Sequence, residues 1–388
     1  MITVAVLTGT RADYGLLRGL LSAIDAEPKL QLQLIVTGTH LSDAFGRTVS
    51  EIERDGFEIS ATVPIWSAGD GPLDAAADVG RALPGYARAL EELDPDVLVV
   101  LGDRLEAFAA ATAATILSVP VAHIHGGERT EGAMDDALRH SITKMSYLHF
   151  ASTEEHRRRI IQMGEQPERV FFVGAPIVDA LSVLELLPRE AVEDRFGVRL
   201  PAPTALVTFH PAVMDVAPPQ HLVDEMLAAL LEVEGLHVVI TGSNSDIGTA
   251  DVRARIAAFV ADNPDRVDFI ESFGQLGYLS AMRAASVVVG NSSSTVLEAP
   301  VLGVPSVLIG DRQRGRPLAE SVATPVPHRD RIAEAVRSAI RHDANGAGTE
   351  IFGTPGFAPR VATALRDMPI PRPPRKSFYD IGGESAHD

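Results

Sequence analysis

Short apolar runs alternate along the chain with longer stretches in which apolar residues recur every three or four positions. The runs at 3–8 and 96–102 are dominated by Val and Leu, as expected for strands that are buried on both faces of a parallel sheet. The stretches at 16–26, 74–93 and 105–116 have the period of amphipathic helices. This alternation predicts a parallel sheet built by right-handed crossovers.

The same pattern starts again after a Pro-rich stretch at 200–203, with apolar runs at 204–211 and 286–294 and a helical stretch at 219–231. We therefore expect an α/β protein with two Rossmann-like domains, whose strand ends face a central cleft. The expected division is an N-terminal domain at 1–185, a C-terminal domain at 186–370 and an extended tail at 371–388.

Composition narrows the classes of partner. The 388 residues carry 34 Lys and Arg against 52 Asp and Glu, a net charge of −18, which argues against nucleic acid or an anionic membrane as partner. No Cys is present, so disulfides, thiolate nucleophiles and Cys-based metal sites are excluded. The start of the chain lacks the pattern of a signal peptide, and no apolar run reaches the roughly 18 residues of a membrane span. We expect a cytoplasmic protein.

Two segments of the second half favour an anion site. In NSSSTVLEAP, the hydroxyls and amides of Ser292, Ser293 and Ser294 precede a predicted helix, where they would bind a diphosphate. Glu298 is placed for ribose hydroxyls. Arg312 lies in the basic segment GDRQRGR, which is suited to phosphate. The simpler interpretations are a serine N-cap and a solvated loop. His210 and Asn244 follow neighbouring strands, although Asn244 also suits a turn.

The segment LTGTRADYG ends the first strand and opens the first helix. Gly9 allows a tight turn, and Arg11 lies where a helix N-terminus already favours an anion, so phosphate binding is one interpretation. A turn with a surface arginine is the other. The segment is not GxGxxG, so the dinucleotide fingerprint is missing.

The densest chemistry lies between Gly102 and Lys144, directly after strand-like runs. Acid–base catalysis needs titratable groups in contrasting environments, and this segment supplies several. A metal held by His123 and His125 is the alternative, but no further ligand set is evident, so we expect neither metal nor cofactor. A charged helix start explains some of the carboxylates but not the whole set. The titratable residues of this segment include Asp103, His125, Glu128 and Asp135, and His210, at the end of a predicted strand in the second half, can also move protons.

Taken together, these segments resemble the UDP-N-acetylglucosamine 2-epimerase family, and above all its hydrolysing, sialic-acid-pathway branch. The matching segments run in order over residues 1–320: TGTRADYG, VTGTHLSD, LGDRLEA, HIHGGERTEGAMDDALRHSITK, TFHP, GNSSSTVLEAP and GDRQRGR. The resemblance implies a glycosyltransferase-B-like fold, a UDP-sugar substrate and a homodimer or homotetramer.

The resemblance also implies a reaction. A base removes the C2 proton of UDP-N-acetylglucosamine while UDP leaves C1 by anti elimination, and water then adds to the 2-acetamidoglucal to give N-acetylmannosamine and UDP. Asp103 and Asp135 match the family's catalytic acidic residues. The positions that match substrate contacts are Arg11, His40, Arg104, His210, Asn244, Phe273, Ser292, Ser293, Glu298 and Arg312.

His125 departs from the pattern, because many relatives carry Glu at this position. Either the histidine moves the proton, since its reference pKa is about 6.5, or Glu128 takes the role of that carboxylate. The change also suggests a modified substrate such as a UDP-2,4-diacetamido-2,4,6-trideoxy sugar. A non-hydrolysing epimerase, a glycosyltransferase and a non-catalytic sensor remain alternatives, although a sensor has no need of the acidic cluster.

Overall fold

A computed structural model describes residues 1–42, 47–65, 72–130, 134–211, 215–242, 249–341 and 351–382. The chain divides into two compact units. The first holds Met1–Glu128, Met134–Ala180 and the chain from Gly353 onward, and the second holds Leu181–Phe352 with a short segment that starts at Arg129. The predicted α/β class is confirmed, with one parallel sheet in each unit.

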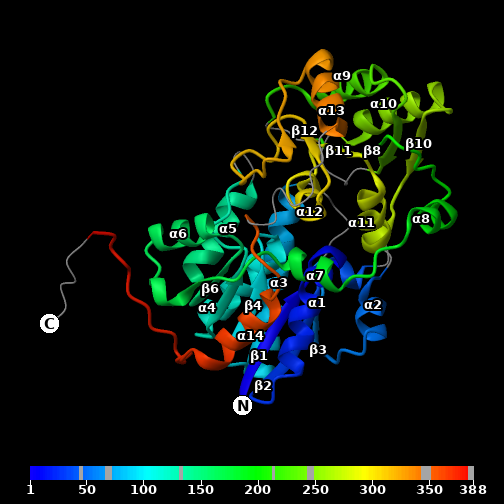
Figure 1. The fold of residues 1–388 in the computed structure, drawn as a ribbon. Helices are drawn as coiled ribbons and strands as arrows, with labels where there is room; N and C mark the ends of the chain where they lie inside the picture. Colours follow the sequence, from blue (N-terminus) through cyan, green and yellow to red (C-terminus); the bar gives the residue numbers. More distant parts are fainter. Residues whose placement is uncertain are drawn as a thin grey trace. The chain divides into compact units, whose positions relative to one another are not determined.

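The first unit is built on a sheet that has seven strands in the described residues, in the order β3-β2-β1-β4-β5-β6-β7. Strands β1 to β4 and β6 are labelled in Figure 1. Along β1 the side chains alternate between two cores. Val4 and Val6 pack into one core, and Ala5 and Leu7 into the other. The strands are β1 (Ile2–Thr8), β2 (Leu30–Thr37), β3 (Ile59–Val63), β4 (Val97–Leu101), β5 (Val121–Ile124), β6 (Leu148–Ala151) and β7 (Val170–Phe172).

Helices cover this sheet. The first begins at Arg11, earlier than the periodicity predicted, because Thr10 and Asp13 form a capping box. The helical elements of the unit are α1 (Arg11–Asp25), η1 (Gly38–Leu41), α2 (Val49–Arg54), α3 (Pro72–Leu93), α4 (Leu105–Ile116), α5 (Met134–Met145), α6 (Glu154–Gln162), η3 (Pro167–Arg169), α7 (Pro176–Val183) and α14 (Phe357–Asp367).

The chain returns to the first unit at its C-terminal end, which differs from the predicted domain at 186–370. Helix α14 packs on α1 (Figure 1), and Phe357 and Val361 lie in the same core as Leu17 and Leu21. The Asp179 carboxylate accepts from the first amides of α14, at 2.6 to 3.0 Å. A helix with an apolar face packs wherever that face is buried, which the local pattern does not specify.

The second unit has a parallel sheet with six strands in the described residues, ordered β10-β9-β8-β11-β12-β13. Its strands are β8 (Thr204–Thr208), β9 (His237–Thr241), β10 (Val267–Ile270), β11 (Val287–Gly290), β12 (Ser306–Leu308) and β13 (Val322–Ala323). Its helical elements are α8 (Arg189–Phe196), α9 (Pro219–Leu231), α10 (Thr249–Asp262), α11 (Gly274–Ala284), η4 (Ser293–Thr295), α12 (Glu298–Val301) and α13 (Arg329–Arg341).

Among the helices in the described part of the chain, none combines the length and the apolar character needed to cross a membrane.

Candidate active site

Asp103 lies directly beyond β4, where the chain turns at Gly102 with a φ of +74°. Its carboxylate, 22% exposed, pairs with the guanidinium of Arg139, which projects from α5 and is 2% exposed. Arg139 Nη1 also lies 3.7 Å from Asp136. The sequence did not single out Arg139 as a site residue, although its spacing from Asp136 puts both on one face of a helix. The pair fixes one Asp103 oxygen next to the end of β4.

His125 lies directly beyond β5, the strand that pairs with β4. Its φ of +65° ends the regular alternation of side chains along the strand, so the alternation that would place His125 on the face of His123 does not hold. His123 is fully buried, with ring nitrogens 2.7 Å from the Gly102 carbonyl and 3.2 Å from the Thr143 hydroxyl. Burial lowers the pKa of His123 to about 3, so its ring is neutral. The described residues contain no group of three or more His, Asp or Glu arranged to hold a metal ion.

The ring of His125 is held by Glu128. The distance from His125 Nδ1 to Glu128 Oε1 is 2.5 Å, and the two side chains are 15% and 6% exposed. A carboxylate only accepts, so Nδ1 donates this bond and Nε2 carries the lone pair. His125 Nε2 has no hydrogen-bond partner among the described residues. An imidazole in this state can accept a proton at Nε2, and Glu128 then stabilises the resulting imidazolium.

Two further residues, Ser152 and His156, extend this pair. The Ser152 hydroxyl donates to Glu128 Oε1 at 2.9 Å and lies 2.9 Å from His156 Nδ1. Burial lowers the pKa of His156 to about 4. Sequence reasoning missed both residues, although Ser152 directly follows β6 and so marks the same edge of the sheet.

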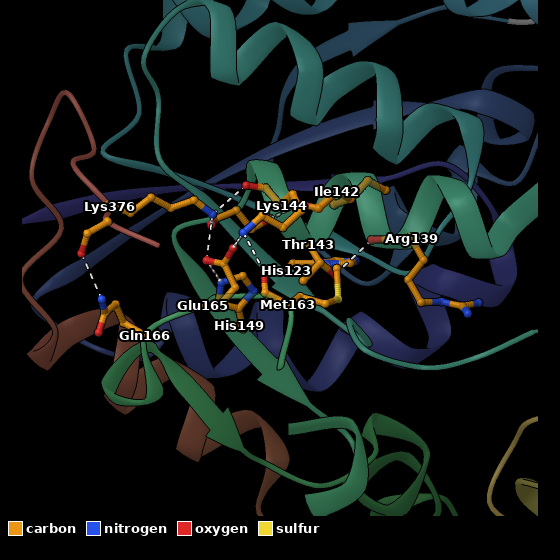
Figure 2. A network of polar contacts seen from close by, with 12 residues as sticks. His123, Arg139, Ile142, Thr143, Lys144, His149, Met163, Glu165, Gln166 and Lys376 are labelled. Carbon is orange, nitrogen blue, oxygen red and sulfur yellow. Dashed lines mark hydrogen bonds and ion pairs between the residues drawn. The ribbon is translucent and has the colours of Figure 1, made fainter. Parts of the chain in front are cut away.

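The rest of the 102–144 segment separates into two groups. Asp135 is exposed in the first turn of α5, where a carboxylate suits the helix dipole, and Asp136 faces Arg139 and His140. Lys144, at the other end of α5, is bound to Glu165 at 2.5 Å. Figure 2 shows Lys144 and Lys376 converging on the Glu165 carboxylate beside His149. Lys144 therefore belongs to a structural network.

The predicted phosphate site at Arg11 is already filled by a carboxylate of the chain. Asp13 accepts from the amides of Gly9 at 2.9 Å and Thr10 at 2.8 Å, and from the Thr8 hydroxyl at 3.0 Å. The Arg11 side chain lies 3.2 Å from Glu51 and is 48% exposed. Arg104, at the start of α4, forms a similar ion pair, in which its Nε lies 3.4 Å from Glu106 Oε2. The two arginines are accessible, but the amides at this helix start are not free.

His40, which the resemblance placed among the substrate contacts, lies inside the fold. Its ring is completely buried, with Nε2 3.1 Å from the Thr8 hydroxyl and Nδ1 2.7 Å from the Thr48 hydroxyl. Both ring nitrogens are therefore used inside the fold, and no surface of the ring is left for a ligand. His40 acts instead on the turn between β1 and α1.

The serine loop of the second unit is less helical than predicted. Instead of the single helix predicted after the serines, a 3₁₀ turn at Ser293–Thr295 is followed by α12, which has only four residues. So short a helix has little dipole, and Pro300 supplies no amide hydrogen. Ser292 caps this turn by accepting from the Ser294 amide at 3.4 Å. Ser293 and Glu298 are partly exposed beside it.

Hydroxyl groups below the loop hold its third serine. Tyr278 Oη lies 2.7 Å from Ser294 Oγ and 3.1 Å from Thr208 Oγ1, and Thr208 lies 2.7 Å from Thr241. Burial raises the pKa of Tyr278, so the phenol stays protonated. The loop is thus fixed from the ends of β8 and β9, which the sequence did not reveal.

Asn291 joins His210 and Arg312, two residues that the sequence placed at the UDP site. Its side chain accepts from the His210 amide and donates to the His210 carbonyl, both at 2.7 Å, and its own carbonyl accepts from Arg312 at 3.3 Å and Gln313 at 3.0 Å. Burial, helped by Arg312, lowers the pKa of His210 to about 4. A neutral imidazole is therefore held at the end of β8.

Two predicted contacts remain. Phe273 is 5% exposed and lies edge-on to Phe196 with ring centroids 5.0 Å apart, inside an apolar cluster. Asn244 lies outside the described residues.

Comparison with protein families and curated relatives identifies similar proteins. The model described as UDP-N-acetylglucosamine 2-epimerase matches residues 22–366. A Campylobacter jejuni GDP/UDP-N,N'-diacetylbacillosamine 2-epimerase (hydrolyzing) is 34% identical, with 81% of each chain covered. A Legionella pneumophila UDP-N,N'-diacetylbacillosamine 2-epimerase (hydrolyzing) is 35% identical, covering 86% of this chain and 88% of the relative. A Neisseria meningitidis UDP-N-acetylglucosamine 2-epimerase is 33% identical, with 87% and 88% covered.

Solved structures share the fold. The Neisseria meningitidis UDP-GlcNAc 2-epimerase bound to UDP-GlcNAc superposes with a TM-score of 0.77 at 19% identity, covering 94% of this chain and 99% of the other. The Methanocaldococcus jannaschii enzyme in complex with UDP-GlcNAc and UDP gives a TM-score of 0.76 at 20% identity, with 94% and 99% covered. The predicted glycosyltransferase-B-like class, with two Rossmann-like sheets, is confirmed.

Proposed function

Because the chain belongs to the UDP-N-acetylglucosamine 2-epimerase family and is a nucleotide-sugar 2-epimerase, we propose that it is a hydrolysing member acting on UDP-N,N'-diacetylbacillosamine, a 2,4-diacetamido-2,4,6-trideoxyglucose. The products are UDP and the free 2,4-diacetamido sugar with the manno configuration at C2. The relatives from Campylobacter jejuni and Legionella pneumophila support this choice of sugar.

The observation that carries the proposal is the His125–Glu128 pair at the end of β5, next to Asp103 at the end of β4. In the proposed reaction His125 Nε2 takes the C2 proton. The C2–H electrons form the C1–C2 double bond, and the C1–O bond breaks so that UDP leaves with that electron pair. Water then adds its hydroxyl to C1 of the glycal, and a proton returns to C2 on the opposite face.

Other groups have supporting roles in the proposal. Asp103, oriented by Arg139, and Asp135 handle protons on the other side of the sugar, and an ionised carboxylate stabilises the positive charge that develops at C1. In the second unit Ser292, Ser293 and Arg312 hold the diphosphate, Glu298 the ribose, and neutral His210 donates a hydrogen bond to the leaving UDP. No redox step is needed.

UDP-N-acetylglucosamine, the substrate that the sequence favoured, is the second candidate. The relative from Neisseria meningitidis supports it. The two substrates share the nucleotide and the C2 acetamido group, so both use the same proposed chemistry and differ only in contacts at C4 and C6.

One experiment separates these readings. The purified protein is incubated in deuterium oxide with each UDP-sugar, and products are followed by NMR. We expect free UDP and the C2-deuterated manno sugar, with kcat/KM about tenfold or more higher for the diacetamido substrate. Higher kcat/KM with UDP-N-acetylglucosamine favours the second candidate. A UDP-linked epimer without free UDP identifies a non-hydrolysing enzyme.

Asp103→Asn provides the control, because it keeps the shape of the side chain and removes its charge. It is expected to lose turnover by orders of magnitude while UDP binding, measured by calorimetry, is retained. In the deuterium oxide experiment with the wild type, a product that carries no deuterium at C2 rules out elimination of UDP.

A further inference from the structure

Behind the proposed base lies a buried chain of hydrogen bonds that the reaction above does not use. It runs from His156 on α6 to Ser152 at the end of β6 and on to Glu128, with Ser152 and His156 3% and 2% exposed. All members lie in the first unit. A buried Ser–His pair placed on a carboxylate suggests that it acts on that carboxylate.

The direction of each hydrogen bond follows from the donors available. The Glu128 carboxylate only accepts hydrogen bonds, so the Ser152 hydroxyl donates its single proton to Glu128 Oε1. Ser152 must then accept from His156, which places the proton of the neutral His156 ring on Nδ1. On the other side of Glu128 the proton lies on His125 Nδ1. Two protons therefore point at the Glu128 carboxylate, a third points at the Ser152 oxygen behind it, and His125 Nε2 has no hydrogen-bond partner among the described residues.

The backbone next to these hydrogen-bonded residues is also held in place. Thr153 caps α6 by accepting from the His156 amide at 3.1 Å, and Arg159 donates to the Gly127 carbonyl at 2.5 Å. Gly127, at a φ of +75°, leaves no room for a Cβ, which would lie 2.5 Å from the His156 carbonyl. Helix α6 thus fixes the loop that carries both His125 and Glu128.

We propose that Ser152 and His156 are positioning residues for the epimerisation: they hold the Glu128 carboxylate in place, and so keep His125 in the one tautomer that can accept the C2 proton. This inference rests on the proposed function, in which His125 is the base. The titratable groups that take part in these hydrogen bonds are His125, Glu128 and His156. The charged and titratable groups beside them are His123, Glu155 and Arg159.

Paired substitutions test whether the hydrogen bond, rather than packing, matters. Asn places its amide nitrogen near the Nδ1 position of a histidine, whereas Gln places it near Nε2. We therefore expect His156→Asn to retain near-normal kcat. His156→Gln and Ser152→Ala should lower kcat by about 10- to 100-fold, a part of the roughly 10²–10⁴-fold that general base catalysis supplies, with little change in KM.

The pH dependence of kcat distinguishes the two roles. It should change if Ser152 acts through its hydrogen bond to Glu128, and it should not change if Ser152 only packs. With fewer donors, the Glu128 carboxylate interacts more strongly with a protonated His125, so the acidic limb should shift to higher pH in Ser152→Ala. His149→Gln is the matched control, because His149 is equally buried on β6 but contacts Glu165. That control should keep the wild-type profile.

A second measurement needs no turnover. The ¹⁵N shifts of the His125 ring report which nitrogen bears the proton, and we expect the Nδ1–H form in the wild type and a mixture in Ser152→Ala. A wild-type Nε2–H form overturns the inference, as does equal loss of kcat in His156→Asn and His156→Gln. Absence of turnover in a wild type that has the expected tautomer counts against the proposed function alone.

Discussion

At the scale of single residues, Asn291 shows how one buried amide organises several loops. It is fully buried, brackets the backbone of His210 through both side-chain atoms, and receives Arg312 and Gln313 on its carbonyl. An asparagine suits this role because its side chain offers a donor and an acceptor at once. The proposed UDP contacts of the second unit therefore depend on a residue that need not touch UDP.

Substitution of Asn291 tests this dependence. Asn291→Asp keeps the acceptor for the His210 amide but turns the donor into a charge that faces the His210 carbonyl. We expect UDP affinity to fall by about tenfold or more, since a buried unpaired polar group costs about 1–3 kcal/mol. Calorimetry with UDP measures the change. Gln220→Glu, at an exposed pair with Asp251, is the control and should bind UDP normally; unchanged binding by Asn291→Asp contradicts the prediction.

At the scale of elements, the extended segment after α14 fastens the C-terminal end of α5. Lys376 Nζ donates to the carbonyls of Lys144 and Ser146, at 2.6 and 2.8 Å, and to Glu165 at 2.8 Å (Figure 2). Burial alone raises the pKa of Glu165, but hydrogen bonds from His149 and the two lysines outweigh it and lower this pKa to about 2. The other end of α5 carries Arg139, the partner of Asp103.

We therefore expect Lys376→Ala to destabilise the first unit. It removes a cation from a buried carboxylate and the cap from two carbonyls, and the loss should be about 1–3 kcal/mol in the free energy of unfolding. Urea denaturation followed by circular dichroism measures it. Arg375→Ala, at the exposed neighbouring position, should change the free energy by less than about 0.5 kcal/mol. Equal stability of the two variants counts against the role of Lys376.

At the scale of the whole molecule, buried neutral histidines link stability to pH. Burial lowers the pKa of His123 to about 3, and the pKa values of His156 and His210 to about 4. Below about pH 6.5 these histidines bind protons in the unfolded chain but stay neutral in the folded protein. Their contribution to the free energy of unfolding is therefore complete above that pH and is lost as the pH falls toward their folded-state pKa values.

The expected result is a decline of the urea midpoint between pH 7 and pH 5. At pH 5 each of these histidines should cost on the order of 2 kcal/mol of unfolding free energy relative to pH 7. Glu165 adds a loss only below about pH 4.5, because its folded pKa is depressed. Comparison of the wild type with His123→Gln isolates one site, since the variant should show a shallower dependence on pH. A midpoint that is flat from pH 7 to pH 5 contradicts this account.

The sequence by itself determined most of the strands, most of the helices and the edge of each sheet where the chemistry gathers, but not the short strands β7 and β13. These features follow from periodicity and from the rule that polar groups follow the carboxyl ends of parallel strands, and both are local. They placed Asp103, His125 and Glu128 after two adjacent strands, β4 and β5. They placed His210 and the serine loop after another two adjacent strands, β8 and β11.

Only the tertiary structure decided what each polar group is paired with. Asp13 fills the turn offered to phosphate, His40 is enclosed by Thr8 and Thr48, and Asp103 meets Arg139 from another element. Helix α14 joins the first unit by burying its apolar face against α1, and Asp179, far away in sequence, accepts from the amides at its start. Pairing and burial depend on contacts between distant segments, which the periodicity of one segment does not encode.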